Sequence, residues 1–128
     1  MDRRKSAVMP AYIDGCFTVC DVVDGTPDPA APDFSPRVLR PRELGPVWFR
    51  ELAVYDRTRA TLQQADVEVT RKVAIPRWED IGPLSVVLIG GEQHRVYNAA
   101  QVISRQGFPE TELTLVKPEQ VFPVESGE

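Results

Sequence analysis

The chain is poor in the residues that most often carry out chemistry. It has one histidine and two cysteines among 128 residues. His94 stands in an alternating strand pattern beside Gly90–Gly91, where a lone histidine is expected to be exposed or hydrogen-bonded, not a base or a ligand. Cys16 and Cys20 fall four positions apart in another strand pattern, a separation of roughly 13 Å that a disulfide does not bridge. No second cysteine pair completes a zinc site, so we expect two reduced thiols and no metal.

Other signatures of enzymes are missing as well. Gly90–Gly91 joins two strand patterns and does not open a helix, so a phosphate-binding loop is not expected. Three aspartates share one loop without the regular spacing and closing glutamate of a calcium loop: Asp24, Asp28 and Asp33. The remaining notable carboxylates are expected to be solvated in loops: Glu79, Asp80, Glu110 and Glu112. The sequence therefore predicts a protein that is not an enzyme and needs no cofactor.

The chain also lacks long apolar runs and an excess of positive charge. No run approaches the roughly 20 apolar residues of a membrane span, and the basic start is not followed by an apolar segment, so neither a span nor a secretory signal is expected. A net charge of −4 argues mildly against a surface that grips nucleic acid. Local basic groups are expected to be solvated or to form intersubunit ion pairs, with phosphate contact as the alternative: Arg3–Lys5, Arg37 with Arg40 and Arg42, and Arg57 with Arg59, Arg71 and Lys72.

Proline is the residue type in excess. The chain has 12 prolines, and they cluster between Pro10 and Pro46. Residues 24–36 are not compatible with a helix or a central strand, because each proline removes a backbone donor and fixes the backbone. We expect a Pro-rich loop region over residues 24–46, and long loops in small domains are usually functional or mobile.

The rest of the chain alternates between apolar and polar residues in short segments. We expect one mainly β domain over residues 1–128, a small antiparallel β-barrel or sandwich of five to six strands with one short helix. Residues 1–10 are expected to be a flexible N-terminus and 118–128 a tail. The first strand places Phe17 and Val19 on one face and both cysteines on the other. The expected strands are 11–23, 46–56, 66–75, 84–89, 93–104 and 111–116, and the expected helix is 57–65.

The order of several short motifs resembles the small head-closure, or head–tail connector (stopper), proteins of long-tailed bacteriophages. The resemblance covers roughly Val47 to Lys117 and departs where Tyr97 follows Val96 and where the Pro-rich loop does not align. The motifs are Val47-Trp48-Phe49-Arg50-Glu51, Tyr55-Asp56-Arg57, Gln64-Ala65-Asp66, Lys72-Val73-Ala74-Ile75-Pro76, Val87-Leu88-Ile89-Gly90-Gly91, Arg95-Val96-Tyr97 and Thr111-Glu112-Leu113-Thr114-Leu115.

The resemblance implies a structural virion protein, made in the host cytoplasm, that forms a homo-oligomeric ring in the neck of the particle. Its implied partners are other copies of itself, a portal-side adaptor protein and a tail completion or terminator protein. Packaged double-stranded DNA passes through the ring without sequence-specific binding. A loop held in the channel is also implied, and the candidate residues are Asp24, Asp28 and Asp33. The alternative for this loop is a surface segment that orders on docking.

Aromatic and arginine residues outside the core dominate interface energetics, so four residues are candidate interface anchors: Trp48, Arg57, Trp78 and Phe108. Trp48 is equally compatible with a place in the core. Two other functions remain open, and an unrecognised hydrolase that depends on His94 is a more distant third. One is a different virion joining subunit, such as a tail completion or terminator protein. The other is a β-barrel module that binds nucleic acid, for which Tyr97 near Arg95 is the one suitable pair on a strand.

Overall fold

A computed structural model describes residues 11–26, 29–30, 36–54 and 67–125 of the chain. Within these residues it contains seven strands and no helix. The strands are β1 (Gly15–Asp24), β2 (Arg37–Pro41), β3 (Val47–Leu52), β4 (Val69–Pro76), β5 (Ser85–Ile89), β6 (Glu92–Ile103) and β7 (Pro109–Val116).

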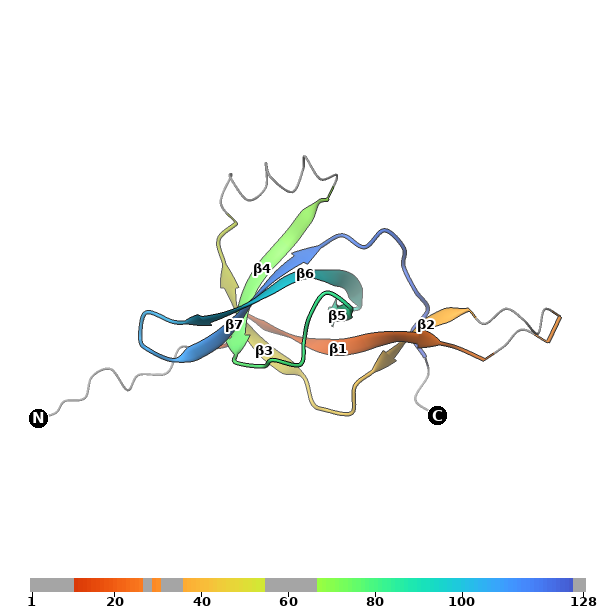
Figure 1. The fold of residues 1–128 in the computed structure, drawn as a ribbon, viewed down its shortest axis with the longest axis horizontal. Helices are drawn as coiled ribbons and strands as arrows, with labels where there is room; N and C mark the ends of the chain where they lie inside the picture. The colour runs from red at the N-terminus through yellow and green to blue at the C-terminus, as the bar shows by residue number, and fades with distance from the viewer. Residues whose placement is uncertain (1–10, 27–28, 31–35, 55–66, 126–128) are drawn as a thin grey trace, which may run out of the picture.

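Six of the strands close into an antiparallel β-barrel (Figure 1). Around the barrel the order is β1, β3, β4, β7, β6 and β5, and pairing of β5 with β1 closes it. The seventh strand, β2, pairs with the second half of β1 outside the closed set. The expected mainly β barrel is thus confirmed.

The barrel forms because the apolar positions of each strand recur with a period of two and so face one side. Phe17 and Phe49 stack in the interior with ring centroids 5.8 Å apart. As expected, Phe17 and Val19 share the interior face of β1, while Cys20 lies in a different cluster. The interior cluster consists of Phe17, Val19, Phe49, Val73, Ile75, Ile81, Val87, Val96, Leu113 and Leu115.

A second apolar cluster lies between β1, β2 and β5. Its buried members are Cys20, Leu39 and Val86, and Phe122 of the C-terminal segment packs against them. Gln93 holds this segment through its side-chain amide, which donates to the Phe122 carbonyl at 2.5 Å and accepts from the Phe122 N–H at 3.1 Å. The expected tail is therefore docked on the barrel as far as residue 125.

The Pro-rich region, expected to be a loop over residues 24–46, contains the strand β2. β2 pairs with β1 in a regular register from Cys20↔Pro41 to Asp24↔Arg37. The prolines at 36 and 41 flank Val38 and Leu39 without interrupting them, so the donors that this strand needs are present. Burial of Leu39 in the second cluster then favours pairing over a free loop.

Most of the other expected strands are present, with bounds that differ by a few residues. The expected alternation over 66–75 is broken because the pairing of β4 with β7 shifts register between Val69 and Arg71. β6, expected to bend, has a register shift between Val96 and Asn98. The expected helix at 57–65 lies outside the described residues. β5 and β6 are joined by a two-residue turn, Gly90–Gly91, whose φ angles of 59° and 82° suit glycine.

Candidate interaction surface

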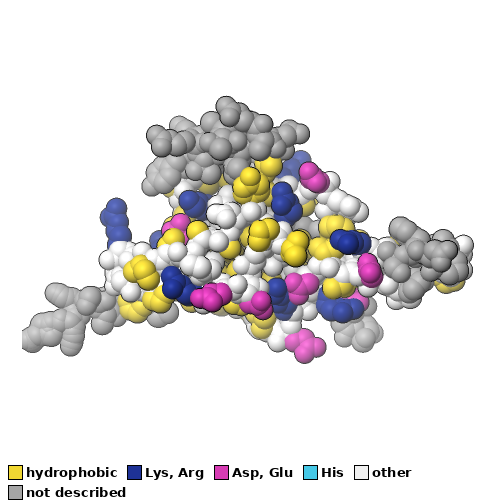
Figure 2. All heavy atoms as spheres, viewed as in Figure 1, with side chains coloured by type: hydrophobic (Ala, Val, Ile, Leu, Met, Phe, Trp, Pro, Cys, Tyr) yellow, Lys and Arg dark blue, Asp and Glu magenta, His cyan; other side chains and the backbone are white. Residues whose placement is uncertain are grey.

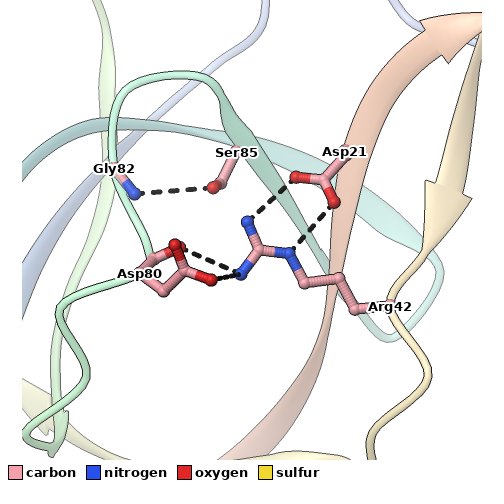
Figure 3. A network of polar contacts seen from close by, with 5 residues as sticks. All are labelled: Asp21, Arg42, Asp80, Gly82 and Ser85. Atoms are coloured by element: carbon pink, nitrogen blue, oxygen red, sulfur yellow. Dashed lines mark hydrogen bonds and ion pairs between the residues drawn. The ribbon is translucent and has the colours of Figure 1, made fainter.

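Arg42 joins three parts of the fold on one side of the barrel (Figure 3). Its Nε and Nη2 donate to the two carboxylate oxygens of Asp21 on β1, at 3.0 and 2.9 Å. Its Nη1 donates to the Asp80 carbonyl at 2.9 Å and lies 3.8 Å from the Asp80 carboxylate. These hydrogen bonds to the Asp21 carboxylate hold the pKa of the Arg42 guanidinium above its ordinary value. Arg42 therefore fixes the β2–β3 connector and the β4–β5 connector against β1.

Trp78 supports the same arrangement from inside. The Arg42 guanidinium carbon lies 5.4 Å from the centroid of the Trp78 ring, which packs against the interior cluster. The Trp78 N–H of the backbone donates to the hydroxyl of Thr111 on β7 at 2.9 Å. The β4–β5 connector is thus anchored at its start by Trp78 and further along by Asp80. Connectors held in this way lose little conformational entropy when a partner binds.

Large apolar side chains project into solvent from these two connectors and from the start of β3, which follows the first of them. Leu44 is 44% exposed, Trp48 is 52% exposed and Leu84 is 88% exposed. We name residues 42–48 and 77–84 the connector surface. Tryptophan and arginine are enriched among the residues that dominate protein–protein contacts, so this surface, with Trp48 exposed and Arg42 at its base, is the candidate contact site.

The four predicted interface anchors lie in different environments. Trp48 is an exposed residue of the connector surface and not a core residue. Trp78 is partly buried beneath Arg42, and Phe108 is partly buried in the turn between β6 and β7. Arg57 lies outside the described residues. The structure therefore brings two of the four, Trp48 and Trp78, to the connector surface.

Of the three candidate channel residues, only one is described. Asp24 is exposed at the end of β1, and its carboxylate is 4.0 Å from Arg37 on β2. Asp28 and Asp33 lie outside the described residues.

The residues that organise the connector surface could not be predicted from the sequence. Arg42 belongs to a local basic group in the sequence, but its partner Asp21 is 21 positions away and no local pattern links the two residues. Leu44 precedes Gly45, and Leu84 follows Pro83. Both lie in short connectors, where the alternation of apolar and polar residues gives no indication of which side chains are exposed.

Glu110 corrects the expectation of a solvated carboxylate. Its side chain is 1% exposed, accepts from Arg50 at 2.7 Å and accepts from the Tyr12 hydroxyl at 2.7 Å. Glu110 belongs to β7 and is covered because Arg50 and Tyr12 reach it from distant parts of the chain. Burial, followed by the hydrogen bond to Glu110, raises the pKa of Tyr12 to about 12. This network ties the N-terminal segment to the barrel.

His94, Cys16 and Cys20 lie in separate environments of the fold. His94 is buried, and its Nδ1 is 2.8 Å from the hydroxyl of Thr70; burial lowers the pKa of the imidazole. Cys16 and Cys20 are free thiols, as expected, and burial raises the pKa of Cys20. No group of three or more His, Cys, Asp or Glu side chains among the described residues is placed to hold a metal ion.

A pocket of about 690 Å³ lies beside His94. Its lining includes two acidic residues, Glu68 and Glu92, and two basic residues, Arg71 and Lys117. Because acidic and basic residues line the pocket in equal number, the pocket does not favour an anionic over a cationic ligand.

Charges are also mixed on the face shown in Figure 2. Lys and Arg side chains there are interspersed with Asp and Glu and with apolar groups, and they do not merge into one basic patch. Within the described part of the chain, no helix has the length and apolar character needed to span a membrane. A scan against models of known protein families finds no match to this chain, and a search among curated proteins finds no similar sequence.

Proposed function

We propose that this protein is a structural subunit of a bacteriophage neck. It forms a ring between the portal-side adaptor and the tail, closes the DNA-filled head and presents the surface on which the tail docks. The observation that carries the proposal is the connector surface, where Arg42 holds apolar groups exposed on a closed barrel. The motif resemblance over residues 47–117 gives this surface its biological setting.

A closed barrel suits a joining subunit for a physical reason. Association costs translational, rotational and side-chain freedom, so a surface that is already rigid retains more of its contact energy. The bidentate Arg42–Asp21 pair and the packed ring of Trp78 supply that rigidity. Trp48 and Leu84, whose side chains are exposed, are the groups that bind the neighbouring protein in this proposal.

The charge of the chain suits a ring that DNA traverses. Each phosphate that a protein neutralises adds salt-dependent affinity, which would retard a moving duplex. With a net charge of −4, the subunit has no overall attraction for DNA. Asp24, exposed at the end of β1, stands at the start of the segment that we propose for the channel.

The partners in this proposal are further copies of the chain, a portal-side adaptor and a tail completion or terminator protein, in the virion. The test is electron microscopy of lysates from the encoding phage with this gene deleted, beside a complemented control. We expect heads without tails, filled or leaking, together with free tails of normal length. Normal tailed virions in the deletion lysate would refute the neck role.

A nucleic-acid-binding module is the second candidate, because the Arg95 guanidinium lies 5.8 Å from the centroid of the partly exposed Tyr97 ring. Bases stack on such rings while basic groups follow the backbone. Tight, salt-sensitive binding of single-stranded DNA by the purified protein, lost in Tyr97→Ala, would favour this function. A tail completion or terminator role differs only in ring position, which microscopy of labelled virions would locate.

A further inference from the structure

The second half of β6 has an open edge. β5 pairs with β6 only from Glu92 to Arg95, whereas β7 pairs with β6 as far as Ile103. Among the described residues, no strand pairs with the other edge of β6 from Val96 onward. Figure 1 shows the reason, since the β6–β7 hairpin projects from the side of the barrel.

The register shows which backbone groups face this edge. The Ser104 N–H donates to the Phe108 carbonyl at 2.8 Å, so the backbone N–H of Ser104 points toward the β7 side of the hairpin. Backbone groups alternate in direction along a strand of an antiparallel ladder, so those of Val102 and Ala100 also point toward β7. The N–H and C=O groups of Ala99, Gln101 and Ile103 therefore point away from β7, toward the open edge.

The sequence of this edge contains none of the usual protection against pairing. Natural edges carry charged side chains, proline or inward-pointing charges that discourage a second strand. The nine residues from Val96 to Ser104 include no charged residue and no proline, in a chain that is 27% charged. Ile103 is 62% exposed at the end of this stretch. An open and unprotected edge is expected to have a strand partner.

We propose that the open edge of β6 pairs antiparallel with the same edge of a second copy of this chain. A twofold axis passes beside Gln101, so Gln101 faces its own counterpart and Ala99 of each copy faces Ile103 of the other. This register makes three hydrogen-bonded pairs from the outward-pointing residues, each exchanging two bonds. The exposed Ile103 side chain then packs beside Ala99 of the other copy.

The lack of charge is what selects a second copy as the occupant. In a twofold contact the same surface of each copy meets its counterpart on the other, so a charged residue near the axis would face an identical charge. An uncharged edge is self-complementary without this penalty, whereas an edge built for a charged segment of another protein would carry the opposite charge. The contact closes on itself after two copies and so is not the contact that builds a ring. It is a solution form of the free subunit, and it does not depend on the proposed function.

Charge variants at Gln101 test the pairing and its symmetry together. Sedimentation of the wild-type full chain should show a reversible dimer. Gln101→Lys and Gln101→Glu should each weaken the dimer about five-fold, because like charges then face each other across the axis. An equimolar mixture of the two variants should recover dimers that contain one copy of each. Gln106→Lys, in the β6–β7 turn, is the matched control and should dimerise like wild type.

Disulfide trapping tests the same register without variants that weaken the dimer. In a Cys16→Ser background, Gln101→Cys should form an intermolecular disulfide under mild oxidation, whereas Asn98→Cys should not, because residue 98 does not face itself in this register. A wild-type protein that stays monomeric up to millimolar concentration would overturn the proposal. So would a Gln101→Lys variant that dimerises as well as wild type, or efficient trapping of Asn98→Cys.

Discussion

Arg42 and Asp21 form a bidentate ion pair, with both carboxylate oxygens of Asp21 accepting from the guanidinium at 2.9–3.0 Å. Only 19% of the Arg42 side chain is exposed, because the Trp78 ring and the Asp80 carbonyl occupy its other sides. One side chain therefore links β1 to two connectors that are far apart in the sequence. This link therefore fixes the positions of the exposed side chains on those connectors.

Arg42→Ala should lower the free energy of unfolding by about 2 kcal/mol, because charge-assisted hydrogen bonds and the packing of the Trp78 ring are lost together. Urea denaturation followed by tryptophan fluorescence measures the change. The matched control is Arg40→Ala, which removes an exposed ion pair with Glu125 and should have a much smaller effect. Equal losses in the two variants would contradict a special role for Arg42.

Gly15→Ala should destabilise the barrel. A Cβ at this position would lie 2.7 Å from the Phe49 ring, whose own place in the interior cluster leaves it little room to shift. Overpacking of this kind costs about 1–3 kcal/mol, and thermal unfolding measures it. Gly45→Ala, where nothing lies within 4 Å of the added Cβ, should unfold like wild type. An unchanged melting temperature for Gly15→Ala would show that Phe49 moves freely.

The network of Tyr12 with Glu110 predicts a loss of stability at high pH. The folded-state pKa of Tyr12 is raised to about 12 from an ordinary value of 10.0, so the stabilisation is fully present below pH 10. It is lost as the pH rises toward 12, because the unfolded chain then releases the proton first. Urea unfolding between pH 8 and pH 11.5 measures this decline. Tyr12→Phe should be less stable at pH 8 and should show a shallower decline; a parallel decline would assign the effect to other groups.

The fold was largely predictable because the strands carry strong alternation. Phe17 and Val19 reveal the interior face of β1 without any knowledge of their partners. β2 was missed because its short apolar stretch stands among prolines, and only its pairing with β1 and the burial of Leu39 identify it as a strand. Local pattern predicts a strand well where the strand has its own amphipathic face, and poorly where a distant partner stabilises it.

The candidate site was less predictable, since it depends on contacts between distant residues. Trp48 was identified from residue type alone, but the sequence left open whether it lies in the core. The burial of Glu110 depends on Arg50, which is 60 positions away, and on Tyr12, which is 98 positions away. No short stretch of the sequence contains Tyr12, Arg50 and Glu110 together. From its local sequence alone, Glu110 is therefore expected to be a solvated carboxylate.

Trp48 provides the sharpest test of the connector surface. Because its side chain is 52% exposed, Trp48→Ala should change the free energy of unfolding by less than about 1 kcal/mol. In complementation of a phage that lacks this gene, the same variant should lower the yield of tailed particles about ten-fold or more, as expected for a central interface residue. Tyr97→Ala, which removes another partly exposed aromatic ring, on β6, should complement normally. Trp78→Ala distinguishes a packing role from a contact role. Because the Trp78 ring packs against the interior, its loss should lower the free energy of unfolding by about 3 kcal/mol. Full complementation by Trp48→Ala would place the contact surface elsewhere on the barrel.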